Sequence, residues 1–308
     1  MIQPDHYNSY DVFGLRVASD IFFPELEANV GFLDEPHVYI VIEDLNNVWK
    51  ALHINDNEFY IKEKRIMFKI DGTAIFCIED GFKIIVSPMQ GSDINKIKLY
   101  ILGTCFGALL IQRRILPLHG SAISINGKAY AFIGESGAGK STLASALLNE
   151  GHLLLSDDVI AVTFENGVPF AAPAYPQQKL WRDSMEHFGM ESSQYSPLFE
   201  RERKYAIPVR KHFRNKPLEL AGIFELRKTK MEEVSCLSIS KLEKLYLLSC
   251  HTYRNFFVNK LGLLDWHFKT ISQLANTIDV FRISRPDHYF ATSHLISEVL
   301  KKTERVSV

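Results

Sequence analysis

The feature that most constrains this chain is a glycine-rich run at residues 134–142, which fits the pattern Gly-x-x-x-x-Gly-Lys-[Ser/Thr]. Glycines let the backbone curl until successive N–H groups face one concavity, which an anionic phosphate can fill. We call this run the phosphate loop, and we expect Lys140 to reach the terminal phosphates and the Ser141 hydroxyl to bind Mg²⁺. The run consists of Gly134, Glu135, Ser136, Gly137, Ala138, Gly139, Lys140, Ser141 and Thr142.

The segments on either side of the phosphate loop stand in the order that such a loop requires. Residues 128–133 are short and apolar, as in a buried strand, and residues 142–151 have a helical pattern that Gly151 ends. The dipole of this helix adds positive potential at the loop. The alternative is a glycine turn that binds nothing, and the strand–loop–helix order disfavours it. The sequence therefore predicts that the chain binds a nucleoside triphosphate.

The predicted nucleotide is ATP. Residues 259–262 read Asn-Lys-Leu-Gly, which is similar to the Asn-Lys-x-Asp motif that binds guanine. Gly262 stands where that motif has its aspartate, so the carboxylate that contacts guanine is missing. We therefore expect ATP rather than GTP.

Composition excludes several classes of protein. The chain has 308 residues, 46% of them apolar, and a formal net charge of −1, so no overall basic field attracts nucleic acid. The four cysteines lie far apart, which argues against a zinc site or a disulfide framework and suits a reducing cytoplasm. The first residues lack the pattern of a signal peptide, and the longest apolar run, 99–111, is shorter than the ~20 residues that span a bilayer. We expect a cytoplasmic protein in which this run is a buried helix, with no membrane or nucleic-acid partner.

Length and pattern predict two domains joined by a helix. Up to about residue 88, short strands alternate with tight turns such as Asp71-Gly72 and Asp80-Gly81, which is typical of a small antiparallel β domain. This part carries no chemical motif, so we expect it to position a substrate or to support assembly. The predicted boundaries are 1–94 for this domain, 95–117 for the connecting helix and 118–308 for the domain with the phosphate loop.

Two further features place carboxylates beside the phosphate loop. The Asn126-Gly127 turn joins strand 118–125 directly to the strand before the loop, so this pair is antiparallel, unlike neighbouring strands in doubly wound nucleotide folds. Residues 153–155 form a minimal apolar strand that ends at Asp157 and Asp158. A strand end beside the loop is where a metal-binding carboxylate belongs, and adjacent residues of an extended segment point to opposite sides. We assign Asp158 to Mg²⁺ and Asp157 to the acceptor hydroxyl as general base; the alternative is that one of them only caps the turn.

Two basic segments follow the aspartates. Residues 177–188 are predicted as a short helix that carries Lys179 and Arg182, either of which could reach a phosphate, although a solvated basic face is favoured. Residues 201–216 hold seven Lys or Arg against one Glu. For this second segment, a role in guiding an acidic substrate and a solvated surface are equally supported.

Three motifs together carry a resemblance to a known family. His119-Gly120, the phosphate loop and the run Gly-His-Leu-Leu-Leu-Ser-Asp-Asp at 151–158 stand in one order and spacing. They resemble the catalytic core of the HPr serine kinase/phosphorylase family, which is similar in fold to phosphoenolpyruvate carboxykinase. The resemblance covers residues 116–162 well and the rest of the second domain loosely. It is much more specific than the phosphate loop alone.

The resemblance implies roles for individual residues. In the family, the histidine of the His-Gly pair sits beside the first aspartate and helps to set its protonation, which implies that His119 lies beside Asp157. Lys140, Ser141 and Asp158 correspond to the triphosphate and magnesium positions. The family's downstream Glu-Ile-Arg-Gly run is absent, and this chain reads Tyr-Pro-Gln-Gln-Lys-Leu-Trp at 175–181. That segment and the run Phe-Arg-Ile-Ser-Arg-Pro at 281–286 resemble kinases that phosphorylate the C-terminal serine of lasso-peptide precursors.

The fold and function expected from the resemblance are specific. The fold is α/β or α+β, with a small, mostly antiparallel N-terminal β domain and a C-terminal P-loop domain of the HPr kinase type. The activity is an ATP- and Mg²⁺-dependent transfer of phosphate to a seryl hydroxyl of a peptide or small protein. Alternatives are an HPr(Ser) kinase/phosphorylase, a kinase for a small hydroxylated metabolite, and a nucleotide-gated ATPase or binding subunit, although the Leu-Ser-Gly-Gly-Gln signature of transport ATPases is absent. The family's hexamers are consistent with a homo-oligomer.

Overall fold

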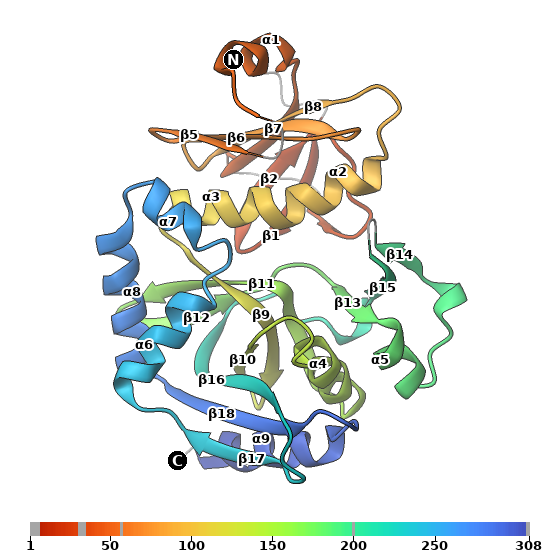
Figure 1. Ribbon diagram of the computed structural model, residues 1–308, viewed down its shortest axis with the longest axis vertical. Helices are drawn as coiled ribbons and strands as arrows, with labels where there is room; N and C mark the ends of the chain where they lie inside the picture. Colours follow the sequence, from red (N-terminus) through yellow and green to blue (C-terminus); the bar gives the residue numbers. More distant parts are fainter. Residues whose placement is uncertain (1–6, 30–34, 56–57, 199–200, 306–308) are drawn as a thin grey trace. The chain divides into compact units, whose positions relative to one another are not determined.

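The computed structural model describes residues 7–29, 35–55, 58–198 and 201–305. The chain divides into two compact units: one comprises Met1–Ile115 and Arg254–His267, and the other comprises Leu116–Tyr253 and Phe268–Val308 (Figure 1). The phosphate loop and both aspartates belong to the second unit. Compactness does not show which parts fold independently, so the domain boundaries at 94 and 117 stay a prediction.

The first unit is built on an eight-stranded sheet with the order β3-β1-β2-β4-β8-β7-β6-β5. The pairs β2–β4 and β4–β8 are parallel, and its other pairs are antiparallel, so the sheet is mostly antiparallel. Its elements are β1 (Asn8–Val12), β2 (Leu15–Ser19), β3 (Glu27–Ala28), β4 (Val38–Ile42), α1 (Asn46–Leu52), β5 (Phe59–Lys62), β6 (Arg65–Ile70), β7 (Ala74–Glu79), β8 (Lys83–Pro88), α2 (Ile94–Tyr100), the π-helix η2 (Ile101–Cys105), α3 (Phe106–Gln112) and α7 (Phe256–Lys260).

The tight turns of this sheet lie where the sequence predicts them. Asp80, Gly81 and Phe82 join β7 to β8, and Asp80 and Gly81 have φ angles of 51° and 71°, the left-handed conformation that glycine and aspartate adopt most readily. Gly72, with φ of 62°, lies in the turn between β6 and β7. The turn chemistry therefore sets the register of the three strands.

One continuous helix, formed by α2, η2 and α3, covers a face of the sheet (Figure 1). The Asp93 side chain caps it by accepting a hydrogen bond from the N–H of Asn95 at 2.8 Å. The ring of Tyr100 lies 6.3 Å from that of Phe68 and 5.7 Å from that of Phe76, on β6 and β7. The helix predicted from residue 95 onward is therefore part of the core of this unit.

The same helix is also the one candidate for a membrane span among the described residues. It covers Ile94–Gln112, 19 residues, which is longer than the apolar run 99–111, and it is long and apolar enough by length and composition alone. However, 78% of its most apolar window is buried inside the protein. Such burial is typical of a core helix in a folded domain.

The second unit contains a seven-stranded sheet and a separate three-stranded sheet with the order β13-β15-β14. Helices α4, α6, α8 and α9 pack on the larger sheet (Figure 1). Its elements are β9 (Leu116–Ile125), β10 (Lys128–Ile133), α4 (Lys140–Asn149), β11 (Leu153–Glu165), β12 (Val168–Ala172), β13 (Gln177–Trp181), α5 (Arg182–His187), the 3₁₀ helix η3 (Ser192–Gln194), β14 (Ser196–Leu198), β15 (Arg201–Pro208), the 3₁₀ helix η4 (Arg210–His212), β16 (Leu218–Thr229), β17 (Ser235–Ser238), α6 (Lys241–Cys250), α8 (Leu264–Thr277) from Phe268 onward, β18 (Asp279–Pro286) and α9 (Thr292–Arg305).

The larger sheet closes on itself. Its order is β10-β9-β11-β12-β16-β18-β17, and β10 also pairs with β16, so the first five strands form a ring. The pairs β10–β16 and β16–β18 are parallel, and the others are antiparallel. Asn126 and Gly127, with φ of 50° and 78°, make the predicted tight turn from β9 to β10. The sheet is therefore mixed, as the predicted antiparallel hairpin beside the loop requires.

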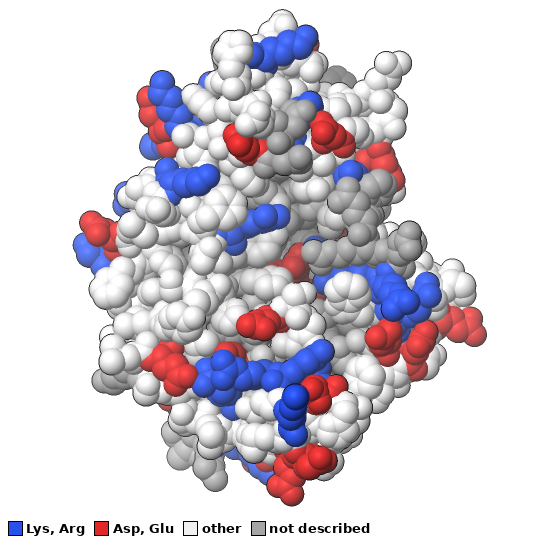
Figure 2. Space-filling model, in the orientation of Figure 1, with Lys and Arg blue, Asp and Glu red and all other residues white. Residues whose placement is uncertain are grey.

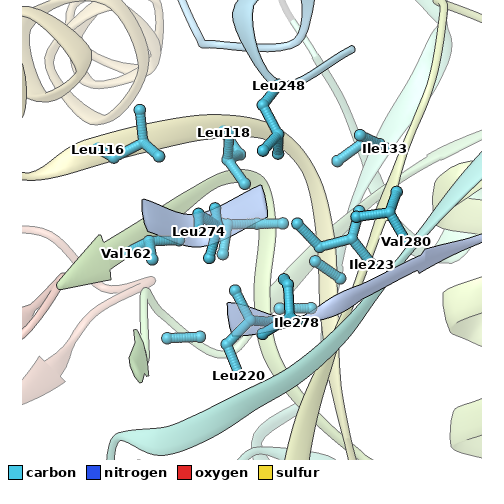
Figure 3. Packing of buried hydrophobic residues seen from close by; sticks show 14 of the residues in the cluster. Leu116, Leu118, Ile133, Val162, Leu220, Ile223, Leu248, Leu274, Ile278 and Val280 are labelled. Atoms are coloured by element: carbon cyan, nitrogen blue, oxygen red, sulfur yellow. The ribbon is translucent and has the colours of Figure 1, made fainter. Parts of the chain in front are cut away.

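Two apolar clusters hold the second unit together on opposite faces of its strands. On β16, Ile223 belongs to one cluster and Phe224 to the other, because successive side chains of a strand point to opposite faces. The first cluster packs Leu248 of α6 and Leu274 of α8 against the sheet (Figure 3). The second cluster contains residues of α4 and α9. Together the two clusters fix the strand that leads into the phosphate loop.

Two segments of the second unit differ from the sequence prediction. Residues 177–181, predicted as the start of a helix, form β13, and the helix begins only at Arg182. The predicted minimal strand at 153–155 is the start of β11, which runs to Glu165, so Asp157 and Asp158 lie within a strand rather than at its end. In both cases pairing with a distant strand, which local sequence does not reveal, decides the structure.

Candidate functional site

The phosphate loop connects the end of β10 to the start of α4, as predicted. Gly134, Gly137 and Gly139 have φ of 141°, 78° and 107°, in the region that favours glycine. A Cβ at position 134 would lie 2.5 Å from the carbonyl oxygen of Leu226 on β16. Position 134 therefore needs glycine for two reasons, its conformation and its closeness to β16.

Lys140, the first residue of α4, lies inside the loop. Its Nζ donates hydrogen bonds to the carbonyl oxygens of Gly134 at 2.7 Å and Glu135 at 3.0 Å, and the residue is 8% exposed. Burial, followed by repulsion from Lys204, lowers the pKa of Lys140 to about 8. Among the described residues, the hydrogen bonds of this buried cation go to carbonyl oxygens. Such a cation gains strongly from an anion, so the loop fits a bound phosphate group.

Asp157 lies beside the phosphate loop and is 4% exposed. Its Oδ1 accepts hydrogen bonds from the hydroxyls of Ser121 at 2.6 Å and Ser141 at 3.0 Å, and its Oδ2 accepts one from the N–H of Lys179 at 2.7 Å. The contact with Ser141 joins the carboxylate to the hydroxyl that the sequence assigns to Mg²⁺. Hydroxyl and carboxylate oxygens are hard ligands of the kind that Mg²⁺ prefers.

The oxygens of Ser141 and Asp157 suit a magnesium ion that arrives with a nucleotide. Among the described residues no group of three or more His, Cys, Asp or Glu could hold a metal ion by itself. Mg²⁺ commonly binds through one or two protein oxygens, retained waters and the phosphates of the substrate. The donor set of this site therefore fits Mg²⁺ bound together with a triphosphate.

Asp158 lies among basic groups, next to Lys179 and His119. Its Oδ2 accepts a hydrogen bond from Nζ of Lys179 at 2.6 Å, and its Oδ1 lies 3.6 Å from Nδ1 of His119. Burial acts to raise the pKa of Asp158, but attraction from Lys179, His119 and Lys204 outweighs it and holds the pKa well below its ordinary value. Asp158 is therefore an ionised carboxylate with one oxygen bound to Lys179.

The orientation of the His119 ring follows from its partner. Nδ1 lies 3.0 Å from the carbonyl oxygen of Asp158, and a carbonyl can only accept, so Nδ1 carries the proton. Burial lowers the pKa of His119, and the attraction of Asp158 only partly opposes this, so the ring is neutral near pH 7. Nε2 is then the nitrogen with the free lone pair.

These contacts correct one expectation from the sequence. The resemblance placed His119 beside Asp157, whereas His119 contacts both the carbonyl and the carboxylate of Asp158. The physical reason is a register shift of β11 against β9 between Leu154 and Ser156, together with φ of 81° at Asp158, which re-aims the two side chains. The Ser141 hydroxyl contacts Asp157, and the assignment of Asp158 to Mg²⁺ and of Asp157 to the acceptor hydroxyl stays a prediction.

The close approach of β10 to β9 explains why a glycine, Gly120, follows His119. It pairs with Ile133 at the end of β10, and a Cβ there would lie 2.2 Å from the carbonyl oxygen of Phe132. This close approach sets His119 and Ser121 against the two aspartates on β11, since Gly120 pairs with Asp158 and Ser121 with Asp157. The glycine of the His-Gly motif therefore allows β9, β10 and β11 to pack closely at this point.

Lys179 differs most from its predicted environment. The sequence favoured a solvated basic face for this residue, but its side chain is only 6% exposed and it contacts both aspartates. Burial acts to lower the pKa of Lys179, and attraction from Asp158 outweighs it and raises the pKa above its ordinary value. Lys179 therefore belongs to the site, which the sequence pattern alone did not indicate.

The basic stretch 201–216 supplies one further cation near the site. It forms β15, η4 and the segment up to β16, and basic side chains gather around the three-stranded sheet and α5 (Figure 2). Lys204 is close enough to influence the pKa values of Lys140, His119 and Asp158, and its Nζ lies 5.6 Å from the centre of the Trp181 ring. A role of this stretch in substrate binding stays a prediction.

Two residues at the site were not singled out in the sequence. The N–H of His119 donates to the carbonyl of His251 at 2.7 Å, and the ring of Tyr253 lies 5.8 Å from that of His119. Burial, followed by repulsion from Lys140 and His119, lowers the pKa of His251 to about 4. Both residues follow α6, far along the chain from His119, and no motif or spacing signals them.

Comparison with known proteins gives partial matches to one family. An HPr kinase/phosphorylase from Mycoplasmopsis pulmonis is 32% identical over 87 residues, 28% of this chain and 28% of that protein. The HPr kinase/phosphorylase from Lacticaseibacillus casei strain BL23 is 29% identical over 157 residues, 47% of this chain and 48% of that protein. The chain thus spans less than half the length of these curated relatives, and no family model matches it.

A solved structure gives a weaker likeness. The Hpr(Ser) kinase/phosphatase from Coxiella burnetii aligns with a TM-score of 0.32 and 18% identity, over 62% of this chain and 97% of that one. A likeness at this level carries no argument about fold or activity, so the relation depends on the sequence matches. The chain is therefore HPr kinase-like: part of its length is related in sequence to the HPr kinase/phosphorylases.

Proposed function

We propose that this chain is an ATP-dependent serine kinase, which transfers the γ-phosphoryl group of ATP to a seryl hydroxyl of a peptide or small protein. The observation that carries the proposal is the hydrogen bond from the Ser141 hydroxyl to the buried carboxylate of Asp157. It joins the phosphate loop to a carboxylate pair whose second member, Asp158, lies next to His119. The proposed nucleotide site and the proposed proton acceptor would therefore lie next to each other.

The residues of the phosphate loop would hold the triphosphate. The N–H groups of residues 134–142 and the dipole of α4 favour the phosphate anion, and Lys140 would exchange its carbonyl contacts for the terminal phosphates. Ser141 and Asp157 would hold Mg²⁺, which neutralises charge on the transferring phosphate.

The acceptor hydroxyl would lie on the side of Asp158. One oxygen of this carboxylate is bound to Lys179, and the other faces His119 and can accept the proton of a seryl hydroxyl. We therefore assign Asp158 as general base, which exchanges the roles that the sequence gave to the two aspartates. A general base contributes about 10²–10⁴-fold to the rate.

His119 acts as a positioning residue in this scheme. Its Nδ1–H donates to the Asp158 carbonyl, which holds the backbone of the strand at the site. Most of the rate would come from placing the hydroxyl in line with the phosphate and from neutralising charge, because phosphoryl transfer demands little covalent chemistry of the protein. The rigid three-strand arrangement of β9, β10 and β11 suits that requirement.

The substrate class rests on the relatives and on the two motifs outside the core. The relatives are named for the protein HPr, which supports a protein or peptide acceptor. The runs at 175–181 and 281–286 favour the C-terminal serine of a lasso-peptide precursor as the acceptor. We also propose that the enzyme is cytoplasmic, uses ATP with Mg²⁺, and forms a homo-oligomer.

Labelled ATP tests the proposed activity directly. The chain is incubated with [γ-³²P]ATP and Mg²⁺ and with four separate acceptors: a peptide that ends in serine, the same peptide with serine moved inside, purified HPr, and free hydroxylated metabolites. We expect label on the peptide or on HPr, and none with the Lys140→Met variant. Label only on a free metabolite would instead support a small-molecule kinase. ATP hydrolysis without any labelled acceptor would contradict the kinase proposal.

A further inference from the structure

Lys179 is buried on an edge strand and faces the site. It lies in β13, which pairs with β15 so that Lys179 is opposite Ala206 and Leu180 is opposite Tyr205. Leu180 belongs to a small apolar cluster with Tyr205 and Ile207, and Lys179 points to the other side of the strand, as alternation requires. Lysine is almost never fully buried unless it is paired, so its contacts here explain its position.

A single residue contacts both members of the carboxylate pair. The backbone N–H of Lys179 donates to Oδ2 of Asp157 at 2.7 Å, and its Nζ donates to Oδ2 of Asp158 at 2.6 Å. Two adjacent carboxylates in a partly buried strand repel each other, and the lysine cation offsets that repulsion. The contact on Asp158 leaves its Oδ1 on the side of His119.

The ion pair of Lys179 with Asp158 is better explained by the orientation that it gives Asp158 than by a contribution to stability. A buried ion pair is weak support for stability, because removing two charges from water costs about as much as their attraction returns. The ion pair does, however, fix the direction of the Asp158 carboxylate, which lies between Lys179 and His119.

We propose that Lys179 is a positioning residue: its ammonium group fixes the Asp158 carboxylate so that the free oxygen is presented to the acceptor hydroxyl, while its backbone holds Asp157 beside Ser141. The part that concerns transfer rests on the kinase function proposed above. The part that concerns the placement of Asp158 does not. Lys179 thereby connects β13 of the three-stranded sheet to both aspartates of the proposed phosphoryl-transfer site.

Kinetics of Lys179 variants test the proposal in the full chain. Lys179→Met keeps the apolar stem and removes the ammonium, so we expect kcat to fall by about 10²-fold, the cost of a misplaced catalytic group. The Kd for Mg·ATP is expected to be unchanged, because the ammonium that the variant loses contacts Asp158, whereas the backbone N–H that contacts Asp157 is kept. Lys179→Arg, which can still bind the carboxylate, should recover most of the lost kcat. Lys128→Met is the matched control, since Lys128 pairs with Glu219 at 3.3 Å at the far end of β10.

A second measurement needs no activity. Removing one partner of the pair leaves the other charge buried and alone, whereas removing both does not. We therefore expect Lys179→Met and Asp158→Asn each to melt below the wild type, and the double variant to melt above Lys179→Met. Failure of the wild type to label any acceptor would contradict the kinase function, and this thermal cycle alone would then decide whether Lys179 holds Asp158.

Three results would overturn the inference. The first is a Lys179→Met variant that retains the kcat of the wild type. The second is a parallel loss of kcat and Mg·ATP affinity, which would make Lys179 a nucleotide ligand. The third is strictly additive melting shifts in the double variant, which would show that the two side chains are not coupled.

Discussion

Replacing Gly120 with alanine tests how closely β9 and β10 must approach at the site. A Cβ at position 120 would lie 2.2 Å from the carbonyl oxygen of Phe132, a backbone atom. Real Cβ atoms essentially never come within 3.0 Å of such an atom, so the two strands must separate by the difference, at least 0.8 Å. Because the backbone of β10 continues into the phosphate loop, the displacement moves the loop relative to β9.

Two consequences follow from this displacement. Forcing a methyl group into a close-packed interior costs about 1–3 kcal/mol of stability. Gly120 lies between His119 and Ser121, which contact Asp158 and Asp157, so the same movement misplaces both carboxylates. A misplacement of about 1 Å can lower the rate about 10²-fold. We therefore expect Gly120→Ala to lose both stability and phosphoryl transfer.

Gly222→Ala is the matched control for this experiment. Gly222 also lies in an extended strand of the same sheet, but the nearest atom to its added Cβ is Cδ1 of Tyr130 at 3.3 Å, which belongs to a side chain that can adjust. Urea unfolding of both variants gives their free energies of unfolding, and the slopes show whether the transition stays two-state. Equal midpoints for Gly120→Ala and Gly222→Ala would refute the reasoning.

Two further predictions concern the phosphate loop. Burial lowers the pKa of Lys140 from 10.5 to about 8. The unfolded chain therefore binds more protons than the folded chain between pH 8 and 10.5, so the free energy of unfolding rises with pH across this window. Thermal unfolding of the nucleotide-free protein should show the rise, and Lys140→Met should abolish it. A wild type whose stability does not change there would argue against a buried Lys140. Nε of Arg285 donates to the carbonyl of Ala138 at 2.8 Å and braces the loop from β18, so Arg285→Ala should weaken ATP binding about 10-fold, the effect of about 1.4 kcal/mol, as measured by calorimetry. Unchanged affinity would show that the loop needs no such support.

Local chemistry was enough to predict much of the fold. The strands at 66–70 and 74–78 lie in β6 and β7, because the Asp71-Gly72 turn between them is a local feature of the sequence. The Asn126-Gly127 hairpin and the helix after the phosphate loop are likewise where the sequence predicts them. These features depend on neighbours in the chain, so the chain itself reveals them.

The residues that decide the site depend on distant strands. Period-2 alternation predicts that Asp157 and Asp158 face opposite sides, but only the register of β11 against β9 determines which of them meets Ser141. The burial of Lys179 follows from pairing of β13 with β15, about which residues 177–181 carry no local signal. The contact of His119 with His251 joins two segments with no shared motif.

In the proposed mechanism, Asp157 binds Mg²⁺ and Asp158 accepts the proton of the acceptor hydroxyl. The Mg²⁺ dependence of phosphoryl transfer, measured side by side for Asp157→Asn and Asp158→Asn, tests it most directly. We expect Asp157→Asn to raise the half-saturating Mg²⁺ concentration about 10–100-fold. Asp158→Asn should lower kcat about 10²–10⁴-fold while the Mg²⁺ requirement stays unchanged. A raised Mg²⁺ requirement in Asp158→Asn, with kcat at saturating Mg²⁺ lost in Asp157→Asn, would contradict the claim.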